Sequence, residues 1–480
     1  MKKKDIAVCA VIFILFSIYF CYLNYEKWLG FGFYFDDAYY QKLYLSIIES
    51  SKHSENLYTS SYGYKNIFFD HLYFSSLIYL PFYYVFKHPL TLRFLQVFFV
   101  FSGIFIYIRL LRKKFGDASF FSALAVSLVF CLHPTIQGAL VTTTHTSAFI
   151  QIFAPALFYF YYTKKMKAYI TVAFMIMLTR EDMAFIIIGW SMITFFKYKD
   201  YKLSLFTFFC ALLYLLAAMF IIQPALLAGN NCEHLLMNKY YCQFGNTYSE
   251  ILKNIFLRFD IVIKHFTSKS AIFVFFILSA PFVFFPFARL YFILPVMPLI
   301  CLNILSVFPG MQDPKNYYYA PIVPFALIAF IFFIYDLPQR LRKICFCIAV
   351  ILAFTVSFRW GYLPISPYTK SLLKNSGEIN MQNLNFIKNN INDINAGIAA
   401  SEFLANYFIL NQELYIFDKD VPFEKFENKI KYIIGFDFQL KLFEEYKDKF
   451  SIVARRGNLF LMRRISDDNK SKKIISSLTI

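Results

Sequence analysis

Two neighbouring carboxylates, Asp36 and Asp37, stand at the start of a stretch with helical periodicity. Tyr40, Tyr44 and Ile47 follow at helical spacing, which predicts an amphipathic helix suited to a membrane surface. Aspartate is a favoured helix cap, and the helix dipole stabilises carboxylates in the first turn. Capping needs only one carboxylate, so the other is a candidate general base, cation ligand or acceptor-orienting group.

Four other polar groups stand within or beside apolar stretches. They are Asp70–His71, the histidines His133 and His145 of "HPTIQGALVTTTHTSAF", the triplet Arg180–Glu181–Asp182, and the segment "QDPKNYYYAP" with Asp313, Lys315, Tyr317 and Tyr318. A single histidine is most often structural, but four such groups favour a shared polar cavity. His71, His145 and a carboxylate have the donor atoms for a metal ion, although their spacing does not fix the distances between them.

The elements that must position these groups are membrane helices. Of 480 residues, 59% are hydrophobic, 21% aromatic and only 16% charged. A soluble domain has about 45–50% apolar and about 25% charged residues. Long uncharged runs such as residues 6–23 predict transmembrane helices. The net charge of +18 gathers beside these runs, which indicates membrane topology and argues against a nucleic-acid-binding surface.

Basic clusters predict which loops face the cytoplasm, because Lys and Arg accumulate there. Such clusters occur at residues 1–4, 109–114, 164–167, 197–202 and 339–343. Placing them all inside predicts about eleven transmembrane helices, with the N-terminus inside and the C-terminus outside. One of these helices is expected over 118–134, and the outer loop that follows it reads "HPTIQGALVTTTHTSAF". The first apolar run has no small-x-small cleavage site, so we expect it to be retained as the first helix.

Two segments do not fit a simple count of spans. Residues 67–86 would place a basic cluster outside if they crossed, so we expect them to re-enter or lie in the interface, which makes 24–89 one long outer loop. The apolar legs on either side of the Arg180–Asp182 triplet are short. They reach about 20 Å, against about 30 Å of hydrocarbon, so the triplet should sit below the outer surface. It either lines a cavity or forms an Arg–acid pair that only holds the hairpin together.

The composition changes after Arg359. Residues 366–480 are rich in Asn, Lys, Asp and Glu and contain five short strand-like runs, at 397–401, 413–417, 431–436, 450–454 and 458–463. Helical patterns, such as the one over 438–450, lie between several of these runs. This alternation predicts a small extracytoplasmic α/β domain beside a membrane domain at 1–362. The domain has no glycine-rich phosphate loop. Cys232 and Cys242 share one polar loop and either pair or remain free thiols.

The chain resembles the C-type glycosyltransferases, which are multi-pass enzymes that use polyprenyl-phosphate sugars. More closely, it resembles the bacterial membrane-protein family called domain of unknown function 2079. The resemblance rests on stretches spread over most of the chain: "FDDAYYQ", "DHLYFSSLIYLPFYYVF", "HPTIQGALVTTTHTSAF", "LTREDMAF", "LPVMPLICLNILS", "YYYAPIVPFALIA" and "GIAASEFLANYFILNQELYIF".

The resemblance implies roles where positions match. Asp36 or Asp37 would be the base that activates an acceptor hydroxyl, and Arg180 would pair with the donor phosphate. Many such transferases carry an acid in the second outer loop, where this chain has only His145, so the requirement for a divalent metal stays open. The candidate substrate-binding residues are Asp70, His71, Arg180, Glu181, Asp182, Tyr317 and Tyr318, and the candidate catalytic residues are Asp36, Asp37 and His145.

The resulting hypothesis is a transferase of the bacterial inner membrane. It would take a polyprenyl-phosphate sugar from the membrane lipid and pass the sugar to an envelope acceptor outside. A transporter or flippase of lipid-linked intermediates is the main alternative, but the chain lacks the internal repeat that many transporters show. A non-catalytic membrane scaffold is the third, and it predicts that Asp36, Asp37 and Arg180 tolerate substitution.

Overall fold

The computed structural model of the chain forms two units. The residues it describes are 3–33, 35–49, 57–59, 71–116, 119–227, 240–374, 377–391, 393, 396–411, 413–417, 423 and 427–465. Unit 1 comprises Met1–Asn24, His71–Phe82 and Leu90–Lys374, and unit 2 comprises Tyr25–Asp70, Tyr83–Pro89 and Asn375–Ile480.

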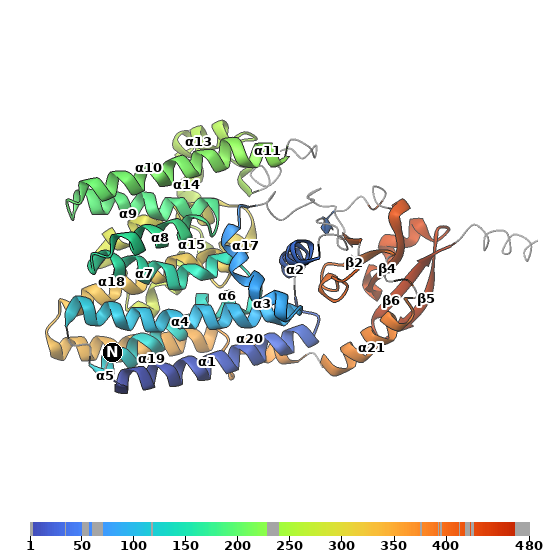
Figure 1. The fold of residues 1–480 in the computed structure, drawn as a ribbon, viewed down its shortest axis with the longest axis horizontal. Coiled ribbons are helices and arrows are strands. Elements are labelled where there is room, and N and C mark those ends of the chain that lie inside the picture. The colour runs from blue at the N-terminus through green and yellow to red at the C-terminus, as the bar shows by residue number, and fades with distance from the viewer. Residues whose placement is uncertain are drawn as a thin grey trace, which may run out of the picture. The chain divides into compact units, whose positions relative to one another are not determined.

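Helices dominate the described part of unit 1, and Figure 1 shows α4, α7, α8, α9 and α10 running alongside one another. The α-helices that lie wholly or partly in it are α1 (Lys3–Leu29), α3 (Leu80–Val85), α4 (Pro89–Phe115), α5 (Phe120–Cys131), α6 (Pro134–Thr142), α7 (Ile150–Tyr162), α8 (Met166–Met177), α9 (Ala184–Phe196), α10 (Tyr201–Ala217), α11 (Gln223–Leu227), α13 (Tyr248–Leu257), α14 (Phe259–Phe266), α15 (Lys269–Ser279), α16 (Met297–Leu305), α17 (Pro309–Gln312), α18 (Val323–Tyr335), α19 (Gln339–Trp360) and α20 (Pro367–Leu373).

Several of these helices can cross a membrane. Within the described residues, five are long and apolar enough, and three bent pairs raise the number to eight. The difference from the expected eleven lies in α7, α8 and α9, which have 13, 12 and 13 residues. At about 1.5 Å per residue each reaches about 20 Å, which is short of a full crossing. The short hairpin predicted around the Arg180–Asp182 triplet is therefore confirmed as α8 and α9.

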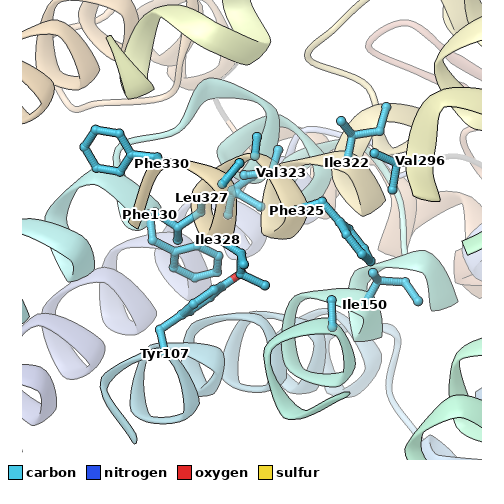
Figure 2. Close-up of a cluster of buried hydrophobic side chains, with 14 of the residues drawn as sticks. Tyr107, Phe130, Ile150, Val296, Ile322, Val323, Phe325, Leu327, Ile328 and Phe330 are labelled. Carbon is cyan, nitrogen blue, oxygen red and sulfur yellow. The ribbon is translucent and has the colours of Figure 1, made fainter. Parts of the chain in front are cut away.

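The core of unit 1 surrounds α18. Nearly every side chain of this helix is buried, because apolar residues cover its whole circumference. Figure 2 shows Phe325, Leu327 and Ile328 of α18 among Tyr107 of α4 and Phe130 of α5. A buried ion pair between Asp5 of α1 and Arg112 of α4 adds a polar link between two further helices. The helices around α18 thus form the frame on which the polar turns described below are mounted.

The helix predicted over 118–134 ends earlier than expected. It breaks at His133, and Pro134 begins a second helix, α6, at an angle of 48° to α5. Proline cannot continue the first helix but suits the first turn of the next. The Nδ1 atom of His133 accepts a hydrogen bond from the Thr135 backbone N–H at 3.3 Å, so this histidine caps α6. The expectation that "HPTIQGALVTTTHTSAF" is the loop between two membrane helices is therefore wrong in its first half, which forms α6.

Residues 74–85 form a short helical stretch, as their apolar but proline-containing sequence favours. A 3₁₀ helix, η2 (Phe74–Tyr79), leads directly into α3, and together they are too short to cross a membrane. This agrees with the prediction that 67–86 does not span, although its first four residues lie outside the described part of the chain.

Unit 2 contains a six-stranded sheet in its described residues, in the order β1-β3-β2-β4-β6-β5. The strands are β1 (Leu57–Thr59), β2 (Gly397–Ser401), β3 (Leu414–Phe417), β4 (Ile430–Phe436), β5 (Phe450–Arg456) and β6 (Leu459–Arg464). The first four strands in the order pair in parallel, and β6 and β5 continue the sheet antiparallel. β2 and β3 are buried along their whole length, as expected of parallel strands covered on both faces.

The sheet recruits the long loop that follows α1. β1 pairs with β3 from more than 300 positions away, with Leu57 opposite Leu414. The same unit holds α2 (Phe35–Ile48) and α21 (Gly377–Asn389). The helix predicted over 438–450 is instead a 3₁₀ helix, η13 (Asp437–Tyr446).

The helix that begins at the paired aspartates is confirmed as α2, but its predicted surface position is wrong. Residues 37–46 are all buried. Gln41 and Lys42, which should face water, form hydrogen bonds to Asn406 and to the carbonyl of Asn411. Because the polar face finds partners in unit 2, α2 is enclosed rather than laid on a membrane surface.

Candidate functional site

Three turns meet the 3₁₀ helix η9 (Tyr317–Ile322) in unit 1. The turns end at Tyr73, His145 and Arg180, and each leads into a 3₁₀ helix: η2, η3 (Thr146–Phe149) and η4 (Glu181–Met183). Two hydrogen bonds join the turns, from the Ser75 N–H to the Leu178 carbonyl at 2.8 Å and from the Thr146 hydroxyl to the Thr179 carbonyl at 2.6 Å. The polar residues at their tips therefore share one location.

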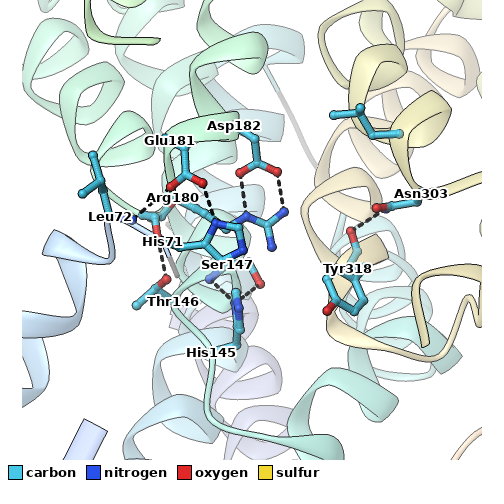
Figure 3. A network of polar contacts seen from close by, with 12 residues as sticks. His71, Leu72, His145, Thr146, Ser147, Arg180, Glu181, Asp182, Asn303 and Tyr318 are labelled. Carbon is cyan, nitrogen blue, oxygen red and sulfur yellow. Dashed lines mark hydrogen bonds and ion pairs between the residues drawn. The ribbon is translucent and has the colours of Figure 1, made fainter. Parts of the chain in front are cut away.

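Arg180 is the central cation of this site and is only 4% exposed. Its Nε and Nη2 atoms donate to the two carboxylate oxygens of Asp182 at 2.6 and 2.5 Å, in a parallel pair (Figure 3). Burial alone would lower the pKa of Arg180, but the nearby Asp182 carboxylate outweighs burial and holds this pKa above its ordinary value. The guanidinium therefore stays charged. The guanidinium lies 5.9 Å from the Tyr318 ring, and Nη1 makes no hydrogen bond to any residue that the structure describes.

Glu181 forms its ion pair with His71. Its Oε1 atom contacts His71 Nδ1, and its Oε2 atom accepts the Leu72 N–H at 3.0 Å (Figure 3). Burial alone would raise the pKa of Glu181, but the His71 charge and these two hydrogen bonds hold it below the ordinary value. Glu181 thus remains an anion that ties the 71–73 turn to η4.

His145 is fully enclosed, and both of its ring nitrogens are engaged. Nδ1 accepts from the Ser147 backbone N–H at 3.2 Å and lies 2.8 Å from the Ser147 hydroxyl. A backbone N–H can only donate, so the network assigns the ring proton to Nε2, which lies 3.2 Å from the Tyr73 hydroxyl. Burial lowers the pKa of His145 well below its ordinary value, and Arg180 and His71 lower it further, so the ring is neutral.

Aromatic rings complete the site. Tyr317 stacks on His145 with ring centroids 4.0 Å apart, and Tyr318 follows at 4.2 Å from Tyr317. Both belong to the 3₁₀ helix η9 (Tyr317–Ile322). Asn303 of α16 holds this helix by donating to the Tyr318 carbonyl at 3.0 Å, as Figure 3 shows. A charged, hydrogen-bonded cluster bordered by tyrosines suits an anionic ligand with a polar, ring-shaped group.

The structure brings together seven of the ten candidate residues. These are His71, His145, Arg180, Glu181, Asp182, Tyr317 and Tyr318. Asp36 and Asp37 lie in unit 2, and Asp70 lies outside the described residues, as does Cys232. Asp36 is partly exposed, whereas Asp37 is fully buried.

Three residues of the site were not identified from the sequence: Tyr73, Ser147 and Asn303. Tyr73 follows His71 by two positions, and that spacing in an extended segment puts two side chains on one side. Ser147 has the same spacing from His145, where a histidine can accept the N–H two residues on. Asn303 sits inside an apolar helix, and such a buried amide needs a partner.

A metal ion does not fit this arrangement. Both nitrogens of His145 are used, and Glu181 binds His71 and the Leu72 N–H. The described residues contain no group of three or more His, Cys, Asp or Glu side chains placed to hold a metal. The His71–His145–carboxylate set suggested by the sequence is therefore a hydrogen-bonded cluster.

The sequence model of the family described as "Predicted membrane protein (DUF2079)" matches residues 33–441. A search of curated proteins finds no match.

Solved structures share the fold at low sequence identity. The crystal structure of ArnT from Cupriavidus metallidurans bound to undecaprenyl phosphate has a TM-score of 0.53 and 10% identity, covering 95% of this chain and 98% of that chain. The Archaeoglobus fulgidus oligosaccharyltransferase in its apo form has a TM-score of 0.50 and 11% identity, over 91% and 70%. Arabinofuranosyltransferase AftD from Mycobacteria has a TM-score of 0.49 and 12% identity; 95% of this chain matches about 40% of that one. The likeness to ArnT and to the oligosaccharyltransferase confirms the expected C-type glycosyltransferase fold with a small C-terminal sheet domain.

Proposed function

Since the chain belongs to the DUF2079 family of membrane proteins, we propose that it is a glycosyltransferase that moves a sugar from a polyprenyl-phosphate donor to an acceptor outside the cytoplasm. The C-type glycosyltransferase fold supports this proposal. The structure of ArnT, which is similar in fold, was solved with bound undecaprenyl phosphate, and this supports a polyprenyl-phosphate donor. The lipid carrier would reach the site from the membrane, and the acceptor would come from the envelope.

The observation that carries the proposal is the buried Arg180, whose Nη1 atom makes no hydrogen bond to a residue in the described part of the chain. Asp182 fixes the plane of the guanidinium through two hydrogen bonds, and Nη1 remains available for a phosphate oxygen. A guanidinium suits phosphate because it offers fixed, charged donors. Since Arg180 is already charged and oriented, little reorganisation is needed when a donor phosphate arrives.

Asp36 is the proposed base, because it is the partly exposed member of the pair while Asp37 is fully buried. The carboxylate would take the proton of an acceptor hydroxyl as that oxygen attacks the anomeric carbon. The bond between this carbon and the phosphate oxygen breaks, and its electron pair leaves with the polyprenyl phosphate. Arg180 stabilises that developing charge. One displacement inverts the anomeric configuration, so the product should have the anomeric configuration opposite to the donor.

His145 has no free basic nitrogen in this arrangement, so we assign it a positioning role. Its Nε2–H donates to the Tyr73 hydroxyl, and its ring supports Tyr317. Glu181 and His71 hold the turn that carries Tyr73.

Binding of undecaprenyl phosphate to the purified, membrane-reconstituted protein tests the phosphate role. Arg180→Lys keeps the charge but loses the fork, so we expect the Kd to rise by about tenfold or more. The matched control is Arg258→Lys, because Arg258 makes the same two contacts to an aspartate two residues later, on an exposed surface. Equal binding by wild type and Arg180→Lys would contradict the assignment.

A further inference from the structure

A buried side-chain amide, that of Gln41, holds the first turn of α2. Gln41 is fully buried and uses both ends of its side chain. Its Nε2 atom donates to the Asp37 carbonyl at 3.1 Å and to the Asn406 Oδ1 atom at 2.8 Å. Its Oε1 atom accepts the Tyr83 hydroxyl at 3.2 Å. One side chain therefore joins the first turn of α2 to the C-terminal part of unit 2.

A second contact fixes the neighbouring residue to the same segment. The Lys42 ammonium donates to the Asn411 carbonyl at 2.5 Å, and Lys42 is only 1% exposed. Asn406 and Asn411 both lie between β2 and β3. The connection that follows the carboxyl end of β2 thus holds two successive residues of α2.

The chain entering α2 is tied to this connection as well. Tyr407, next to Asn406, donates its hydroxyl to the Trp28 carbonyl and stacks on the Trp28 ring at 5.4 Å. It also meets the Phe31 ring edge-on at 5.3 Å. Contacts before and within α2 therefore converge on residues 406–411, and Asp36 lies between them in the chain.

We propose that Gln41 and Asn406 are positioning residues for the Asp36 carboxylate, so that the connection after β2 sets where the base stands. This inference rests on the proposed function. By this inference, the C-terminal part of unit 2 contributes to catalysis by orienting α2. The Gln41 amide donates directly to the backbone carbonyl of Asp37, the neighbour of Asp36. Misplacement of a catalytic group by about 1 Å can cost about 100-fold in rate.

The kinetic test compares Gln41→Met, Asn406→Leu and the double variant in the full-length protein. Each single variant breaks the Gln41–Asn406 hydrogen bond and leaves the other side chain of that pair buried without it, and Gln41→Met also removes the acceptor of the Tyr83 hydroxyl. The double variant replaces both members of the Gln41–Asn406 pair with apolar groups. We expect kcat to fall by at least about tenfold in both single variants, with an unchanged KM for the lipid donor. In the double variant the melting temperature should rise above that of Gln41→Met, because the Asn406 amide is no longer buried without its partner, while kcat stays low. Asn390→Ala, which removes a local hydrogen bond of the same unit, is the control and should retain wild-type activity.

Hydrogen exchange provides a readout that does not depend on the reaction. In the same single variants, the amides of residues 36–41 should exchange at least about tenfold faster, while those of β4 and β6 stay protected. Unchanged exchange in α2 would overturn the inference, and so would a kcat that recovers with stability in the double variant. If exchange changes as expected but Asp36→Asn keeps full activity, Gln41 and Asn406 do stabilise α2, and only the assignment of Asp36 as the base fails.

Discussion

At the scale of single residues, the site depends on paired charges held away from water. Arg180 and Asp182 neutralise one another, as do Glu181 and His71 when His71 is protonated. A buried charge that loses its partner is costly, whereas an arriving ligand of the same sign can replace that partner. A substitution that removes the anionic partner of Arg180 should therefore lower stability, and a bound phosphate should restore part of that loss.

Asp182→Asn tests this directly. The variant leaves the Arg180 guanidinium without its anionic partner, so we expect a loss of about 3 kcal/mol in the free energy of unfolding. Undecaprenyl phosphate should raise the melting temperature of the variant more than that of the wild type, because the phosphate supplies the missing negative charge. Equal shifts in both proteins would contradict a phosphate contact at Arg180.

Lys42 gives a pH-dependent prediction in unit 2. Burial lowers the pKa of this ammonium from 10.5 to about 8. Between about pH 8 and 10.5 the unfolded chain keeps a proton that the folded chain has lost, so stability should rise with pH across this window. The gain is up to about 3 kcal/mol from this residue. Lys42→Met should flatten the rise in melting temperature between pH 8 and 10; a rise of wild-type size in the variant would contradict it.

At the scale of elements, the site depends on short helices that begin directly after its polar residues. η3 and η4 start immediately after His145 and Arg180, which stand in extended backbone conformations. Close approach of elements fixes the aromatic side of the site. A Cβ added to Gly138 of α6 would stand 1.9 Å from the Lys315 carbonyl oxygen, and Thr135 bonds to the Pro314 carbonyl at 2.7 Å.

Gly138→Ala should displace the segment before η9 and with it Tyr317 and Tyr318. We expect transferase activity to fall by about tenfold or more, since small displacements weaken aligned contacts. Gly138→Ser should behave alike, because it adds the same Cβ. Wild-type activity in both variants would show that the aromatic segment tolerates the shift. Activity and detergent-resistant folding measured on the same preparation separate displacement from misfolding.

At the scale of the whole molecule, two units of different chemistry divide the proposed roles. Unit 1 carries the proposed phosphate site, and unit 2 carries the proposed base. The basic clusters place the N-terminus inside and the sheet outside in our proposal. This orientation assigns the acceptor chemistry to the envelope side.

Cysteine labelling tests the orientation. Ser451 lies in β5 and Lys113 near the end of α4, and both are exposed. In a variant without native cysteines, Ser451→Cys should react with an impermeant maleimide in intact spheroplasts. Lys113→Cys should react only after permeabilisation. The reverse pattern would invert the topology and contradict an extracytoplasmic reaction.

Much of this architecture could be predicted from the sequence, for physical reasons. Buried parallel strands give short apolar runs, so the run at 397–401 coincides with β2. β1 could not be predicted, because three residues pair with a strand distant in sequence. The burial of α2 was missed since the partners of Gln41 and Lys42 are contributed by a distant segment. Seven residues of the site could be predicted, because polar groups within apolar stretches and the expected topology placed them on one side of the membrane. Tyr73 could not, since its only sequence signal is its spacing from His71.

The most direct test of the central claim compares envelope glycans and lipid-linked sugars among strains with matched membrane levels of the protein. The strains carry the wild-type gene, a deletion, Asp36→Asn, Asp37→Asn and Arg180→Lys. We expect one sugar species to disappear in the deletion and in Asp36→Asn, with a fall of about 100-fold or more in transfer for a lost base, and to decline in Arg180→Lys. A lipid-linked precursor that accumulates only in the deletion, with wild-type profiles in the point variants, would contradict transfer at these residues and favour transport. An unchanged profile in every strain would contradict the enzyme itself.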